Sequence, residues 1–79
     1  MKVVVRKIRG YAVPGYTMEV LAVDEAGVAF TQPNQVRNRH DALVFGNGLI
    51  TGIMRLERLA DVKLDNCNVV FDPDCDGIE

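Results

Sequence analysis

The stretch from residue 43 to residue 67 constrains the fold more than any other part of the chain. An Asn47-Gly48 pair stands between two apolar runs, and such a pair is the strongest short-range signal for a β-hairpin. Gly52 interrupts the second run, as glycine does where a strand bends or another backbone approaches closely. Residues 62–64 then alternate apolar, polar, apolar before the turn residues 65–66. The pattern predicts three short antiparallel strands, bent strongly enough to close into a small barrel.

The same stretch resembles the first sequence motif of the Sm and Sm-like RNA-binding proteins. In that motif an apolar strand leads into an Asn-Gly or Asp-Gly turn, a bend glycine, an apolar residue, a Met-Asn pair and a Leu-x-Leu strand. Asn47-Gly48 fills the turn and Gly52 the bend. Met54 fills the apolar position, and Ala60-Asp61 stands where the Met-Asn pair would be. The spacing is one residue shorter than the family's at two places.

Residues 8–13, Ile-Arg-Gly-Tyr-Ala-Val, match the second motif of that family, Ile-Arg-Gly-x-x-Val. They precede the first motif here, whereas in the family they follow it, so the match is either coincidence or a sign of permuted strands. If the match is real, the resemblance implies that Arg9 and Gly10 contact RNA. Gly10 also has a purely structural interpretation as the turn residue that ends a first strand.

The resemblance implies an all-β fold for residues 1–79, forming a single domain. The expected architecture is a small, strongly bent antiparallel barrel of the Sm-like or SH3-like type, with room for one short helix. It further implies a ring-shaped homo-oligomer that binds single-stranded RNA and serves RNA processing or metabolism. Asp61 stands where the family's Asn contacts a base, so the resemblance implies that Asp61 contacts a base edge.

Length and composition favour self-association independently of any family. A domain of 79 residues buries only about 60% of the surface of its unfolded chain, which leaves it marginally stable alone. Apolar residues make up 48% of the chain, enough for a core and an additional contact surface. An open strand edge also offers its backbone to another chain. We therefore expect a cyclic homo-oligomer built by pairing of edge strands.

Charge is distributed unevenly along the chain. Residues 1–40 carry six basic and three acidic side chains, whereas residues 41–79 carry three basic and eight acidic ones. The net charge of −2 disfavours nonspecific binding of duplex DNA, which depends on many phosphate contacts. A local cluster of Arg37, Arg39 and His40 is still the best candidate for a nucleic-acid site, for single-stranded RNA or single-stranded DNA. Repeated around a ring, it would form a basic belt with Asp61 nearby.

The remaining pattern predicts mostly strands. Turn residues separate the expected strands, which are Lys2–Arg9, Tyr16–Asp24, Val28–Thr31, Ala42–Phe45, Leu49–Leu56 and Ala60–Phe71. Residues 33–41 are polar and are expected to form a loop. Residues 49–60 also fit an amphipathic helix, although Gly52 would cost that helix up to about 1 kcal/mol. Strand is favoured there because the Asn-Gly turn needs a second strand.

The sequence contains no recognisable catalytic constellation. Serine is absent, the single histidine has no evident partner, and no glycine-rich phosphate loop is present. Cys67 and Cys75 are expected to be ordinary thiols rather than metal ligands. We therefore expect a protein that is not an enzyme and uses no cofactor or metal. The N-terminal residues are charged rather than signal-like, and no run reaches membrane-spanning length, so we expect a cytoplasmic protein.

Two other functional classes remain open. The first is a small protein-binding module, such as the inhibitors of host proteins that phages encode, with an acidic tail for a basic partner. The second is a calcium-dependent adaptor, because residues 72–77 match the first six positions of an EF-hand loop. The chain lacks the later ligands of that loop, so residues 72–79 are better interpreted as an irregular acidic tail.

Overall fold

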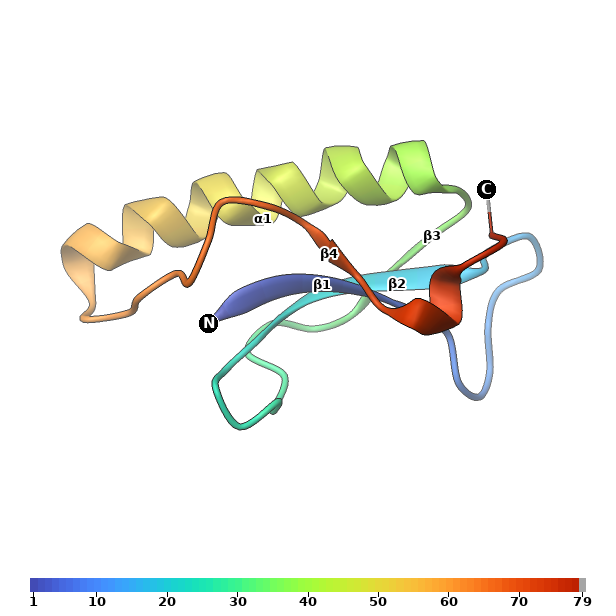
Figure 1. The fold of residues 1–79 in the computed structure, drawn as a ribbon, viewed down its shortest axis with the longest axis horizontal. Helices are drawn as coiled ribbons and strands as arrows, with labels where there is room; N and C mark the ends of the chain where they lie inside the picture. Colours follow the sequence, from blue (N-terminus) through green and yellow to red (C-terminus); the bar gives the residue numbers. More distant parts are fainter. Residues whose placement is uncertain (79) are drawn as a thin grey trace.

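The computed structural model describes residues 1–78 and shows a four-stranded mixed sheet covered on one face by a single long helix (Figure 1). The elements are β1 (Lys2–Lys7), β2 (Met18–Val23), β3 (Asn34–Val36), α1 (Arg39–Leu59), β4 (Val70–Phe71) and the short 3₁₀ helix η1 (Pro73–Cys75). The prediction of an all-β barrel is therefore wrong, because the chain has an α/β fold.

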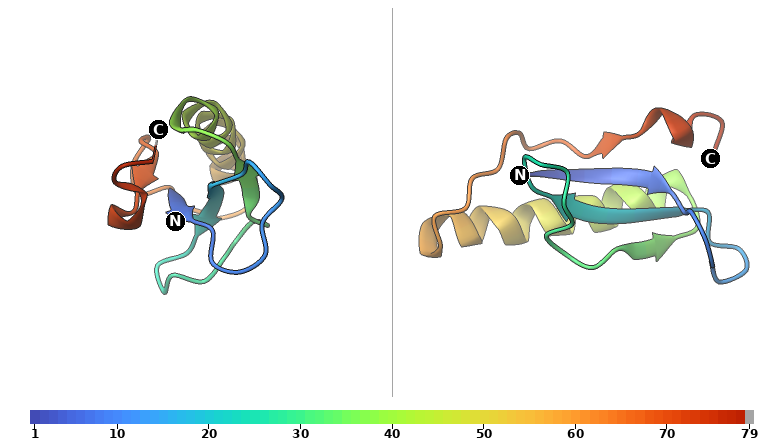
Figure 2. Two further views of the ribbon diagram at one scale, coloured as in Figure 1. Left: turned by 90° about the vertical axis from the view of Figure 1, so that its right-hand side faces the viewer. Right: turned by 90° about the horizontal axis from the view of Figure 1, so that it is seen from below.

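The sheet has the strand order β3-β2-β1-β4 (Figure 2). β1 and β2 form an antiparallel pair along their whole length, with Val4 opposite Leu21. β3 pairs antiparallel with β2, and β4 pairs parallel with β1. The two edge strands therefore run in the same direction, and α1 carries the chain across the sheet between them. A parallel connection of this kind needs a long crossover, which a helix commonly supplies.

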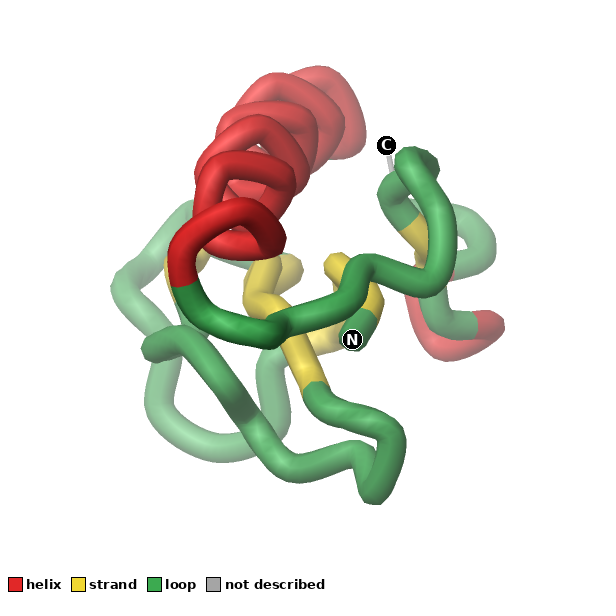
Figure 3. Tube along the Cα trace, turned by 90° about the vertical axis from the view of Figure 1, so that its left-hand side faces the viewer, coloured by secondary structure: helices red, strands yellow, loops and turns green. Residues whose placement is uncertain are grey.

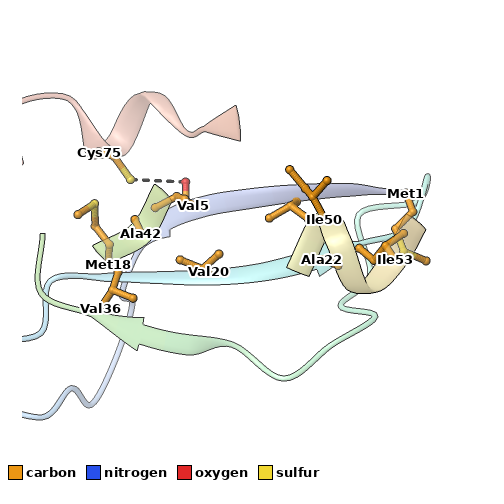
Figure 4. Packing of buried hydrophobic residues seen from close by; sticks show 11 residues of the cluster. Met1, Val5, Met18, Val20, Ala22, Val36, Ala42, Ile50, Ile53 and Cys75 are labelled. Carbon is orange, nitrogen blue, oxygen red and sulfur yellow. Dashed lines mark hydrogen bonds between the residues drawn. The ribbon is translucent and has the colours of Figure 1, made fainter. Parts of the chain in front are cut away.

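The core lies mainly between the sheet and α1 (Figure 4). Its buried members on the sheet side are Met1, Val3, Val5, Met18, Val20, Ala22 and Val36, and those on α1 are Ala42, Ile50 and Ile53. Alternate strand residues point to opposite faces, and Val4, Leu21 and Val23 form a second buried cluster with Val70. Both faces of β1 and β2 are thus apolar, which explains their nearly continuous Val-rich sequences.

Helix α1 occupies the region where the sequence predicted a loop and two strands. Its buried residues, Ala42, Gly46, Ile50 and Ile53, recur at helical spacing. The side chain of Asn38 caps the helix by accepting a hydrogen bond of 2.8 Å from the Asp41 backbone N–H. The Asn47-Gly48 pair lies in mid-helix and forms no turn, so only the alternative helical interpretation of residues 49–60 is confirmed. Tertiary packing against the sheet overrides the local turn signal.

Predictions for the other segments had mixed outcomes. The first two predicted strands are confirmed as β1 and β2. β3 lies inside the expected loop 33–41, while the expected strand 28–31 is reduced to a single bridge at Ala29. The predicted strand Ala60–Phe71 is an irregular return segment except for β4 (Figure 3).

The end of the described chain is packed against the sheet. The Cys75 thiol is buried and donates a hydrogen bond to the Val5 carbonyl, with 3.5 Å between sulfur and oxygen (Figure 4). The segment expected to be an irregular acidic tail therefore contributes η1 and one core residue, and Glu79 lies outside the described residues.

Candidate functional site

Five of the six residues predicted to bind nucleic acid gather at one end of the sheet, where β1 ends and α1 begins (Figure 1). They are Arg9, Gly10, Arg37, Arg39 and His40. Asp61 lies just beyond the opposite end of α1. A helix of 21 residues spans about 30 Å at 1.5 Å per residue, so Asp61 does not join the others. Within one chain, the structure does not provide a basic belt with Asp61 nearby.

Two arginines of this end are engaged within the chain. The Arg39 guanidinium lies 4.1 Å from the centre of the Phe71 ring and donates a 3.3 Å hydrogen bond to the Cys75 carbonyl. The Arg9 guanidinium donates a 2.7 Å hydrogen bond to Asp74, which raises the pKa of Arg9 above its usual value. Arg39 therefore holds the C-terminal segment against the helix, and Arg9 is charge-compensated.

Arg37 is exposed and takes part in no ion pair among residues 1–78. Its guanidinium stacks over the Tyr16 ring, 5.1 Å from the centroid. Tyr11, in the same loop as Tyr16, is 90% exposed. Gln35 holds this loop, because its side chain accepts a 3.3 Å hydrogen bond from the Val13 backbone N–H. Exposed tyrosine and arginine surfaces of this kind can stack on unpaired nucleobases.

A polar cleft of about 350 Å³ opens at the same end. It is lined by Arg6, Arg9, Glu19 and Asp72. Arg6 forms an ion pair with Glu19, its cross-strand neighbour, just as Arg9 pairs with Asp74. Because a carboxylate accompanies each arginine, the cleft carries no net positive charge with which to attract phosphate.

The two cysteines are free thiols that differ in burial. Burial, reinforced by the nearby Asp72 carboxylate, raises the pKa of the Cys75 thiol, so this group stays protonated and unreactive at neutral pH. Cys67 is exposed and also free. In the part of the chain that the structure describes, no three His, Cys, Asp or Glu side chains are grouped to hold a metal ion. No helix among residues 1–78 is both long and apolar enough to cross a membrane.

Helix α1 carries more than half of the exposed large apolar side chains among the described residues. Six of the ten exposed large apolar residues belong to this one helix: Leu43, Val44, Phe45, Met54, Leu56 and Leu59. Val44 and Leu59 are 61% and 84% exposed. With 3.6 residues per turn, Val44 and Leu59 lie on the side of α1 away from the sheet, and the other four lie along the two flanks of the helix. We call these six residues, with the polar and glycine positions between them, the outer surface of α1.

The sequence indicates this apolar surface only if the region is interpreted as a helix. The interpretation of residues 43–67 as strands of a hairpin obscured it. Nine of the fifteen residues from 42 to 56 are Ala, Val, Leu, Ile, Met or Phe, whereas the helix buries only Ala42, Ile50 and Ile53 among them. An Asn38 cap three residues before Asp41 marks the start of the helix. As a helix, this region has more apolar residues than a single buried face requires.

Comparison of the chain with protein-family models, curated proteins and solved structures finds no match.

Proposed function

We propose that this chain is a protein-interaction module that acts by binding and uses the outer surface of α1 as its interface. The observation that carries this proposal is the set of six exposed large apolar side chains on one 21-residue helix. Apolar side chains exposed singly are common on folded monomers, whereas several on one element favour contact with another molecule. Phe and Met, both present on this surface, are enriched in protein–protein interfaces.

Electrostatics favours a protein partner over a nucleic acid. The chain has a net charge of −2, and two of the arginines at the sheet end are already engaged by Asp74 and by Phe71. Affinity for nucleic acid depends on several uncompensated phosphate contacts. Contact between apolar surfaces of two proteins does not depend on uncompensated positive charge.

The first test uses two valines of equal exposure. Val44 on α1 and Val28 in the loop after β2 are both 61% exposed. Tagged chain carrying Val44→Lys or Val28→Lys is used for affinity capture from lysate of the source cells. We expect Val44→Lys to lose the protein captured by the unchanged chain, whether another protein or an untagged copy, and Val28→Lys to retain it. Equal capture by both variants would contradict the proposal.

Binding of single-stranded RNA is the second candidate, and the observation in its favour is the Arg37–Tyr16 stack beside exposed Tyr11. It predicts that labelled U-rich or A-rich oligonucleotides raise fluorescence anisotropy at low salt and that binding weakens as salt rises. Arg37→Ala should weaken it, while Asp61→Ala at the far end should not. Absence of binding at low salt would eliminate this candidate.

A further inference from the structure

Five exposed residues lie along one outward line of α1: Asp41, Val44, Gly48, Gly52 and Arg55. With 3.6 residues per turn, they fall within an arc of about 80° around the helix axis, which exposed Leu59 at the end of α1 also shares. Their spacing is symmetric in sequence. Val44 and Gly52 lie four residues on either side of Gly48, and Asp41 and Arg55 lie seven residues on either side of it.

Packing within the described chain does not require the two glycines of this line. A Cβ on Gly46, on the inner side of α1, would lie 2.6 Å from a Val69 methyl carbon, so packing requires that glycine. A Cβ on Gly48 or Gly52 would meet nothing within 4 Å. Each of these glycines costs a helix interior about 1 kcal/mol relative to alanine. Glycines four residues apart instead permit the close approach of a second helix.

The charges at the two ends of the line have no ion-pair partner in the described part of the chain. Three ion pairs occur among residues 1–78, and neither Asp41 nor Arg55 takes part in them. The two side chains are of opposite sign and equidistant from Gly48. This arrangement is complementary to itself when the helix is turned end for end.

We infer that the outer surface of α1 binds a second copy of the same chain, the two helices running antiparallel about a two-fold axis at Gly48. This inference rests on the proposed function and names its partner. A two-fold axis brings together residues that lie equally far from it on opposite sides. Asp41 of each copy then faces Arg55 of the other, and Val44 faces Gly52. A parallel pair would instead place like charges together.

The sheet edges provide little competing surface for self-association. β3 has three residues and β4 has two. On the exposed length of β2, Thr31 Oγ1 accepts a 3.0 Å hydrogen bond from the Ala22 N–H, and the Phe30 N–H donates a 2.8 Å bond to the Ala22 carbonyl. Short and covered edges recruit other chains poorly. The cyclic assembly expected from edge pairing therefore has little free backbone to use.

The size of the outer surface of α1 limits the affinity that we expect for the dimer. One face of a helix about 30 Å long is smaller than the roughly 800 Å² per partner of a standard stable interface. We therefore expect reversible dimerisation in the micromolar range rather than a permanent dimer.

The test is sedimentation equilibrium of the full chain from 5 to about 500 µM, where the mean mass should rise from 8.7 kDa towards twice that value. Asp41→Arg and Arg55→Asp should each weaken dimerisation roughly tenfold, because each places like charges together at both symmetric sites. The double variant exchanges the charges and should recover most of the affinity. Loss in both single variants with recovery in the double variant is specific to this pairing.

Two further variants control for folding. Arg58→Asp makes the same charge change as Arg55→Asp but lies off the line, and it should shift the dissociation constant by less than about threefold. Gly48→Leu adds bulk where the chain has no neighbour within 4 Å, so it should abolish dimerisation while circular dichroism of the dilute protein stays unchanged.

A mass of 8.7 kDa at every concentration, or a double variant as weak as the single ones, would overturn the inference. The outcome remains distinguishable from failure of the proposed function. Capture of a different protein that depends on Val44, from a chain that is monomeric alone, would leave the interaction module standing with another occupant. If the chain neither dimerises nor captures a protein in a manner that depends on Val44, both proposals are wrong.

Discussion

At the residue scale, the glycines of α1 show how one residue type serves different needs. Gly46 is buried and lets Val69 pack against the helix, whereas Gly48 and Gly52 face outward with no neighbour. Arg39 shows that a charged residue can likewise have a structural role. Its position in a basic cluster indicated ligand binding, but its guanidinium contacts Phe71 and Cys75. The role of each residue depends on which way its side chain points in the folded chain. The composition of the surrounding sequence does not reveal that orientation.

The glycines yield a paired prediction. Gly46→Ala should lower the free energy of unfolding by about 1–3 kcal/mol, because the new methyl group overlaps the Val69 side chain. Gly48→Ala should raise it by up to about 1 kcal/mol, because alanine favours the helix and meets nothing in the chain. Urea unfolding at low micromolar concentration measures both. Shifts of the same sign would contradict the packing described for Val69.

At the scale of elements, α1 depends on a defined start as well as on its buried face. The Asn38 carboxamide accepts from the Asp41 N–H, and Asp41 places a negative charge in the first turn, where the helix dipole favours it. Arg58 places a positive charge in the last turn. These terminal interactions set the helix boundaries, while the sheet supplies most of its stability.

The cap can be tested directly. Asn38→Ala removes the acceptor and should lower the free energy of unfolding by about 1 kcal/mol, whereas Asn38→Asp keeps an acceptor oxygen and should cost less than half as much. Urea unfolding monitored by circular dichroism compares the two. An equal loss in both variants would show that the cap hydrogen bond contributes nothing.

At the scale of the whole molecule, the sheet joins the two ends of the sequence. β1 pairs with β2 on one side and with β4, more than 60 residues later, on the other. The Met1 ammonium also donates to the Lys63 carbonyl over 3.1 Å. Formation of the complete sheet therefore requires contacts between distant parts of the chain, while the β1–β2 pair is local.

Hydrogen exchange should show this hierarchy. We expect the slowest amide exchange in β1 and β2, whose cores are buried on both faces, at rates set by global unfolding. Residues 60–69 form no strand or helix and should exchange at least about 100-fold faster. Mass spectrometry of peptic fragments resolves the two regions. Equal protection in both would contradict a fold centred on the β1–β2 pair.

Local sequence was enough to predict β1 and β2, because Val-rich runs bounded by turn residues favour strands whatever surrounds them. The meeting of Arg9 with Arg37, Arg39 and His40 at one end of the sheet was not predictable, because it depends on β3 and on the start of α1. The secondary structure of residues 39–59 depends on tertiary packing. These residues fit both a bent hairpin and a helix, and the apolar face of β1 and β2 selected the helix because a long element was needed to cover it. The same packing decided the outer surface of α1, since burial of one stripe of the helix left the apolar side chains outside that stripe exposed.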